Sequence, residues 1–147
     1  MNSAPTHDLL MICDTCGKDI ADGQGDIWVK NSDLTDRRTA LREWKERHAT
    51  ESDGGWYTPK QLLERPQLVR WRVTHNHGGC DDDIEAGAYS LEVHRCRTWP
   101  ALVNWTAHLL GTKTWLKDTD WNKVLEGVSR PGGGTRIVAA PPASGTA

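Results

Sequence analysis

Two segments in the middle of the chain alternate between hydrophobic and polar residues, and this pattern predicts two β-strands. Over residues 68–75 one face collects Val69, Trp71, Val73 and His75. Over residues 88–94 one face collects Tyr89, Leu91 and Val93. Successive side chains of a strand point to opposite faces, so each segment offers one face to a core. We expect these two strands to pair with each other, with residues 76–87 as the connecting loop.

Before the first strand, the spacing of apolar residues predicts two helices. The longer helix covers residues 33–50, and Asp33 or Thr35 can cap its start. Its single apolar stripe consists of Leu34, Leu41, Trp44 and His48. A short helix over residues 59–65 follows, with Thr58 as its N-cap and a proline at the first helical position.

After the second strand, the same spacing predicts two further helices. One runs over residues 100–110, between a cap at Thr98 and a stop at Gly111. The other follows Thr119, and its apolar stripe is Trp121, Val124, Leu125 and Val128. Three tryptophans of this region are expected to lie in the core, and a protein-docking groove is the less favoured alternative for Trp105, Trp115 and Trp121.

These elements predict an α+β fold, a small antiparallel sheet packed by C-terminal helices. A glycine-rich turn between apolar ends indicates a β-hairpin over residues 19–29. Residues 1–8 are interpreted as a flexible arm and residues 129–147, rich in Pro, Gly, Ala and Thr, as a disordered tail. A single domain over residues 9–128 remains.

Composition is that of a globular chain, and it gives no sign of a membrane protein. The chain has 147 residues, 37% of them hydrophobic and 26% charged, with a net charge of −2. No apolar run approaches the roughly 18 residues that cross a bilayer, and no signal peptide is recognisable. We therefore expect a cytoplasmic protein without a membrane partner. In a reducing compartment, the four cysteines are better interpreted as metal ligands than as disulfides.

Two short clusters carry residues that bind transition metals. Cys13 and Cys16 form a Cys-x2-Cys pair followed by Gly17, which suits the tight turn called a zinc knuckle. His77 and Cys80 repeat the same spacing. Together they make one tetrahedral ligand set, so we predict a structural Zn²⁺ on Cys13, Cys16, His77 and Cys80. His75 and Cys96 are the alternatives for the fourth ligand. Four unrelated cysteines and a redox pair are less favoured interpretations.

A nuclease is the alternative hypothesis for the same region. The run His75-Asn76-His77 invites comparison with HNH nucleases, and the acidic residues 81–83 can hold a hard cation such as Mg²⁺. In that hypothesis His75 is the general base, acting with His77 and the run Asp81-Asp82-Asp83. The following helix lacks the Asn-x8-His element of such enzymes. A non-enzymatic domain is therefore favoured.

Basic residues suggest a macromolecular partner. Residues 35–75 carry nine basic and six acidic side chains, whereas residues 1–34 carry two lysines and six aspartates. Basic and aromatic residues interleave around Trp71 and Trp99, a pattern that can clamp a phosphate backbone. The candidate contacts with a nucleic acid or an acidic protein surface are Arg37, Arg38, Arg42, Lys45, Arg70, Arg72, Arg95 and Arg97.

The opening Cys13-x2-Cys16-Gly17-Lys18-Asp19-Ile20, followed by a glycine-rich segment, resembles zinc-ribbon and treble-clef modules. In its tryptophan-rich composition, the chain resembles small zinc-binding proteins of actinobacteria and their phages. This resemblance implies a binding module, often regulatory, and it implies no catalytic residues. DNA binding and protein–protein interaction remain equally open for such a module. The sequence leaves the oligomeric state and any sequence specificity open.

Overall fold

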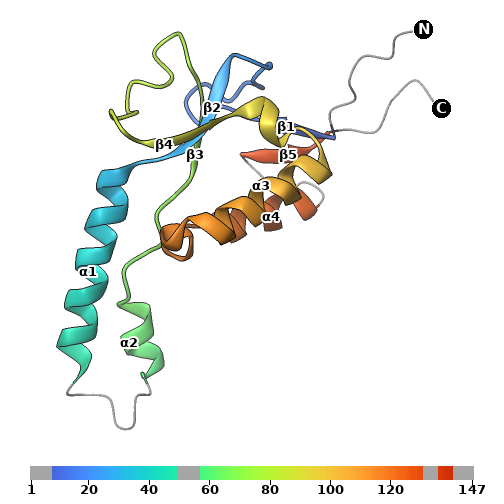
Figure 1. Ribbon diagram of the computed structural model, residues 1–147. Helices are drawn as coiled ribbons and strands as arrows, with labels where there is room; N and C mark the ends of the chain where they lie inside the picture. Colours follow the sequence, from blue (N-terminus) through green and yellow to red (C-terminus); the bar gives the residue numbers. More distant parts are fainter. Residues whose placement is uncertain (1–7, 50–56, 131–135, 141–147) are drawn as a thin grey trace, which may run out of the picture.

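The computed structural model describes residues 8–49, 57–130 and 136–140, which form a mixed helix and strand fold (Figure 1). The strands are β1 (Leu9–Met11), β2 (Gly25–Val29), β3 (Arg72–His75), β4 (Tyr89–Glu92) and β5 (Ile137–Ala139). The helices are α1 (Asn31–Ala49), α2 (Pro59–Leu63), α3 (Trp99–Thr112) and α4 (Trp121–Ser129), with 3-10 turns η2 (Val93–Cys96) and η3 (Thr114–Asp118). The predicted α+β class is confirmed. No helix among these residues is both long and apolar enough to cross a membrane.

A three-stranded antiparallel sheet, in the order β3-β2-β4, forms the centre of the fold. Ile27 of β2 lies between Val73 of β3 and Leu91 of β4. The prediction that β3 and β4 pair directly is therefore wrong, because β2 separates them. The predicted hairpin over residues 19–29 is also wrong, since β2 has β3 and β4 as its partners. Alternation identifies a strand, but it does not identify the strand's neighbours.

A second, two-stranded sheet corrects the predicted disordered tail. β5 pairs antiparallel with β1, in the register Leu9 to Ala139 and Met11 to Ile137. Ile137 is buried in the core, and Arg136 forms a 2.9 Å ion pair with Asp120. The apolar run at 137–139 is short, and the Pro, Gly and Ala residues around it make the segment resemble a disordered tail. Of the predicted arm and tail, residues 1–7, 131–135 and 141–147 lie outside the described residues.

The helices begin and end close to their predicted positions. Thr58 caps α2 in a full capping box with Gln61, and the Thr58 hydroxyl oxygen accepts from the Gln61 backbone N–H at 3.1 Å. Thr98 caps α3 in the same way, accepting from the Ala101 N–H. Gly111 does not stop α3, which continues to Thr112. In α4 the buried side chains are Trp121, Val124 and Val128, as the apolar spacing predicts.

Trp71 lies at the centre of the core and joins the sheet to the C-terminal helices. Its side chain is fully buried, and its ring centroid lies 4.9 Å from Trp121 and 6.0 Å from both Tyr89 and Trp115. The indole N–H donates to the Thr119 hydroxyl at 2.9 Å. Ring packing and this hydrogen bond together hold the segment that leads into β3 against the C-terminal helices.

The loop between β3 and β4 is tied to the start of α1. The carboxylate of Glu85 accepts from the backbone N–H of Ser32 at 2.8 Å and from its hydroxyl at 2.9 Å. These bonds lower the pKa of Glu85, because they favour its ionised form. Arg72 adds weaker ion pairs to Asp33 at 3.6 Å and to Asp83 at 3.7 Å. Loop and helix are thus held together.

Candidate metal centre

A tight turn directly after β1 presents the first two cysteines. The backbone N–H of Cys13 donates to the carbonyl of Lys18 at 2.8 Å, and Gly17 N–H donates back to Cys13 at 2.9 Å. Gly17 has φ of 76°, a conformation that suits glycine and is costly for other residues. Ile12 and Asp19 form an antiparallel bridge at the base of the turn. This geometry is the predicted knuckle.

The second pair of candidate ligands comes from the end of β3 and the loop that follows it. His75 is the last residue of β3 and is paired in register with Gly25 of β2. Two consecutive glycines with positive φ, Gly78 at 68° and Gly79 at 80°, turn the chain back toward Cys80. The hydroxyl of Thr15 donates to the Cys80 carbonyl at 2.9 Å, which fixes this turn against the first knuckle.

The four side chains of Cys13, Cys16, His75 and Cys80 converge, and we call them the Cys3His cluster. Their ligand atoms all lie within 4.8 Å of one another. The Cys16 sulfur is 3.4 Å from Nδ1 of His75. The cluster is close enough to hold a metal ion. Within the described part of the chain, this is the one group of three or more His, Cys, Asp or Glu side chains with that property.

The cluster contains His75 where the sequence favoured His77. Strand pairing holds His75 in place, and its Nε2 lies 3.2 Å from the carbonyl oxygen of Asp19. With Nδ1 directed at the cluster, this contact fixes the ring as second-sphere partners do for metal-bound histidines. His77 is exposed, and its ring centroid lies 5.1 Å from that of His75, outside the cluster. Counting residues back from Cys80 therefore favours a histidine that the structure leaves outside the cluster.

Cys96, the other alternative ligand, belongs to the core instead. It is fully buried, and burial raises the pKa of its thiol to about 12. A thiol in such surroundings is inert and packs as a small apolar side chain.

The cysteine thiols of the cluster differ in acidity. Burial disfavours the thiolate of Cys13, but hydrogen bonds from the backbone N–H groups of Cys16, His75 and Thr15 outweigh burial and lower its pKa to about 6. For Cys80, desolvation and the neighbouring thiols raise the pKa to about 11. Cys13 thus ionises before Cys80 in the metal-free site, and a bound cation favours ionisation of the Cys80 thiol.

An aspartate inside the knuckle braces it, a role that the sequence analysis missed. The carboxylate of Asp14 accepts two hydrogen bonds from Arg70, at 2.9 and 3.1 Å, and one from the Val73 N–H at 3.0 Å. The Asp14 N–H donates to the Val73 carbonyl at 2.7 Å. In the sequence, the only sign of this role is the position of a carboxylate between the two cysteines. Arg70, a candidate partner contact, is engaged in this brace.

Two other candidate partner contacts are buried, which corrects their predicted role. Arg37 is 7% exposed and forms a 2.6 Å ion pair with Asp118. Arg97 is 5% exposed, forms a 2.8 Å ion pair with Asp22 and also donates to the carbonyl of Ile20. Both guanidinium groups are buried and bound to carboxylates of the same chain, so neither is free to meet a partner.

The remaining basic residues are closer to solvent. Arg72 is half-buried over the Trp28 ring at 5.4 Å, and the exposed Arg95 lies 5.9 Å from the centroid of Trp105. The other three candidates, Arg38, Arg42 and Lys45, are exposed side chains of α1 that form no ion pair with a described residue. Among the described residues, the exposed cations of α1 therefore remain the best candidates for contacts with an anionic partner.

The acidic run beside Cys80 does not join the Cys3His cluster. Asp82 and Asp83 are exposed, and Asp83 pairs with Arg72. His75, the base of the nuclease hypothesis, has a partner at each ring nitrogen, the Cys16 sulfur and the Asp19 carbonyl.

Comparisons of the chain with protein-family models, with curated proteins and with solved structures found no match. The resemblance of residues 13–20 to zinc-ribbon and treble-clef modules therefore rests on the residues quoted for it.

Replacing each histidine in turn tests which one belongs to the cluster. We expect His75→Ala to weaken metal binding at least about 100-fold, more than the loss of a second-sphere contact costs. His77→Ala, the matched control, is expected to bind metal as the wild type does. Competition titration of the metal against a chromophoric chelator measures both. Equal losses in the two variants, or a larger loss in His77→Ala, would contradict the assignment of His75.

Proposed function

We propose that this chain is a non-enzymatic domain held together by one structural Zn²⁺ and that it acts by binding an anionic macromolecule, with a regulatory role. The observation that carries the proposal is the convergence of three cysteines and one histidine in the Cys3His cluster. Thiolate and imidazole ligands favour zinc over hard cations such as Mg²⁺. Four protein ligands fill a tetrahedral shell, so no position is left for a substrate or a reactive water.

The partner surface in this proposal lies on α1, at a shallow basic hollow. The residues that border the hollow are Arg38, Leu41, Arg42, Lys45, Glu46, Lys117 and Asp118. Positive charge dominates there, with four cations against two carboxylates, and Asp118 is already neutralised by the buried Arg37. Guanidinium and ammonium groups around a hollow bind phosphate or carboxylate groups. A nucleic acid and an acidic protein surface both offer that chemistry.

The nuclease alternative has less support. It needs His75 as a free general base, and this side chain lies in the Cys3His cluster. It also needs acidic ligands that converge with a histidine. Within the described residues, the run at 81–83 does not do so.

Metal analysis and a binding measurement test the proposal together. We expect about one zinc per purified chain, as four-ligand structural sites bind a single ion. Fluorescence anisotropy, with a labelled DNA duplex and a labelled acidic peptide as separate probes, measures binding. The triple variant Arg38→Gln, Arg42→Gln, Lys45→Gln is expected to lose affinity, and for the duplex the salt dependence should fall by about one unit of slope per lost phosphate contact.

A matched control separates this surface from net charge. Arg47→Gln, Lys60→Gln, Lys123→Gln removes three other exposed cations and leaves the hollow intact. We expect it to bind the preferred probe nearly as tightly as the wild type. If the α1 variant binds both probes as the wild type does, the proposed partner surface is wrong. A chain purified without zinc would contradict the proposed structural Zn²⁺.

A further inference from the structure

The outer face of α3 exposes large apolar side chains without a partner in the chain. Trp99 is 40% exposed, Val103 is 62% exposed and Leu110 is 71% exposed. Over its 14 residues, α3 contains no Asp, Glu, Lys or Arg. Surface helices of soluble domains normally carry charges on their solvent side. A contiguous apolar face of this kind marks an interaction site.

Three of the exposed residues, together with the half-buried Thr106, follow the spacing of a helix-pairing seam. Trp99, Val103, Thr106 and Leu110 are separated by four, three and four positions. Alternating steps of four and three place side chains along one stripe and let them pack against a second helix with the same stripe. This stripe covers less than two heptads and is too short to form an isolated coiled coil. However, α3 is already held in the fold by its buried residues, Leu102 and Leu109.

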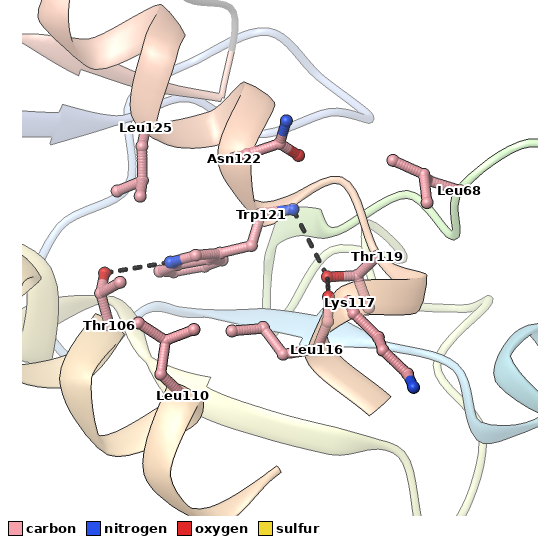
Figure 2. Close-up of a pocket in the computed structure, with 9 residues that line it drawn as sticks. All are labelled: Leu68, Thr106, Leu110, Leu116, Lys117, Thr119, Trp121, Asn122 and Leu125. Atoms are coloured by element: carbon pink, nitrogen blue, oxygen red, sulfur yellow. Dashed lines mark hydrogen bonds between the residues drawn. The ribbon is translucent and has the colours of Figure 1, made fainter. Parts of the chain in front are cut away.

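The seam residues also form one wall of a groove between α3 and α4. Two adjoining hollows form the groove, and both are lined by Thr106, Leu110 and Leu125. Figure 2 shows the Trp121 indole between the two helices, with its N–H directed at the Thr106 hydroxyl, a bond of 3.0 Å. This surface therefore has both projecting side chains and hollows. A surface with both features can be complementary to itself.

We propose that α3 packs antiparallel against α3 of a second copy of this chain, across a two-fold axis, with the seam of each copy over the groove of the other. In a two-fold interface every residue near the axis faces its own equivalent, so any charge there meets a like charge. The uncharged α3 meets that requirement. The proposal does not depend on the metal, and it shares a single residue, Lys117, with the basic hollow on α1.

Charges at the borders of the groove support a second copy as the occupant. Lys117 borders one hollow and Glu126 borders the other, and neither forms an ion pair with a described residue. An antiparallel two-fold arrangement brings Lys117 of one copy toward Glu126 of the other, twice per dimer. A foreign helix would have to supply both the seam and this charge pattern, whereas a second copy already has them.

Sedimentation velocity of the full metal-loaded chain over a wide concentration range tests the dimer. We expect the wild type to dimerise reversibly and Leu110→Glu to raise the dimer dissociation constant at least about 100-fold, since one buried leucine is lost from each copy. Leu110 is mostly exposed in the single chain, so unchanged circular dichroism should show that the variant folds. Leu63→Glu, at an 86% exposed leucine on α2, is the matched control and should dimerise normally.

A charge exchange tests the antiparallel arrangement. Lys117→Glu and Glu126→Lys, made singly, each place like charges together at two points and should weaken the dimer severalfold. The double variant should recover the wild-type dissociation constant. A monomeric wild type at all concentrations, a dimer indifferent to Leu110→Glu, or a double variant no tighter than either single variant would each overturn the proposal.

Discussion

Removing the metal from this domain, by chelation or by Cys13→Ser, is expected to unfold it. The proposed zinc joins the turn at residues 13–16 to the segment at residues 75–80, and these two regions are far apart in the sequence. Structural zinc supplies on the order of 10 kcal/mol in small zinc-finger modules, whereas a whole domain is stable by about 5–15 kcal/mol. The loss is therefore comparable to the total stability of the fold.

Near-ultraviolet circular dichroism, dominated here by eight tryptophans, reports the loss of packing on chelation. Cys96→Ala is the matched control, because it also removes a buried thiol but leaves the Cys3His cluster untouched. That variant should keep its metal and lose roughly 1 kcal/mol, the usual effect of a small change in a core. If the chelated wild type keeps its near-ultraviolet spectrum and its melting temperature, the metal is not required for the stability of the fold.

The second large effect is expected from Trp71→Ala, which should lower the free energy of unfolding by about 3–5 kcal/mol. Trp71 is fully buried and packs against Tyr89, Trp115 and Trp121. Its truncation leaves a large cavity, and it also removes the indole N–H that the Thr119 hydroxyl accepts. Urea unfolding of the metal-loaded chain measures the change.

Trp71→Phe separates the two contributions. It keeps an aromatic ring among Tyr89, Trp115 and Trp121 but lacks the N–H donor, so its loss should be clearly smaller than that of Trp71→Ala. Metal content should stay at the wild-type level in both folded variants, because Trp71 is not a ligand. A Trp71→Ala protein within 1 kcal/mol of the wild type on this scale would contradict the central place of Trp71 in the core.

The helices of this fold could be predicted because their signals are local. The capping box at Thr58 and Gln61 and the apolar spacing of α4 depend on residues within a few positions of one another. Strand partners depend on distant residues. The central place of β2 is determined by its contacts with Val73 and Leu91, which no local pattern in residues 25–29 reveals. For the same reason, no local pattern in residues 137–139 predicts the pairing of β5 with β1.

For the candidate site, spacing identified the cysteines but not the histidine. Cys13, Cys16 and Cys80 can be recognised from the Cys-x2-Cys motif and its distant complement. The choice of His75 follows from the sheet, because pairing with β2 holds His75 beside the knuckle. Burial was equally hidden from the sequence. Arg37 and Arg97 resemble surface cations until Asp118 and Asp22 are seen beside them.

The pairing of β1 with β5 constrains the order in which the chain folds. Leu9 is synthesised well before Ala139, so β1 has to wait for its partner until the long segment between them has left the ribosome. The residues of the Cys3His cluster are all available by residue 80. Metal capture can therefore precede closure of the terminal sheet and hold the N-terminal half together while the rest emerges. Ala140 N–H then donates to the Asp8 carbonyl at 2.7 Å, which brings the two ends of the described chain together once β1 and β5 have paired (Figure 1).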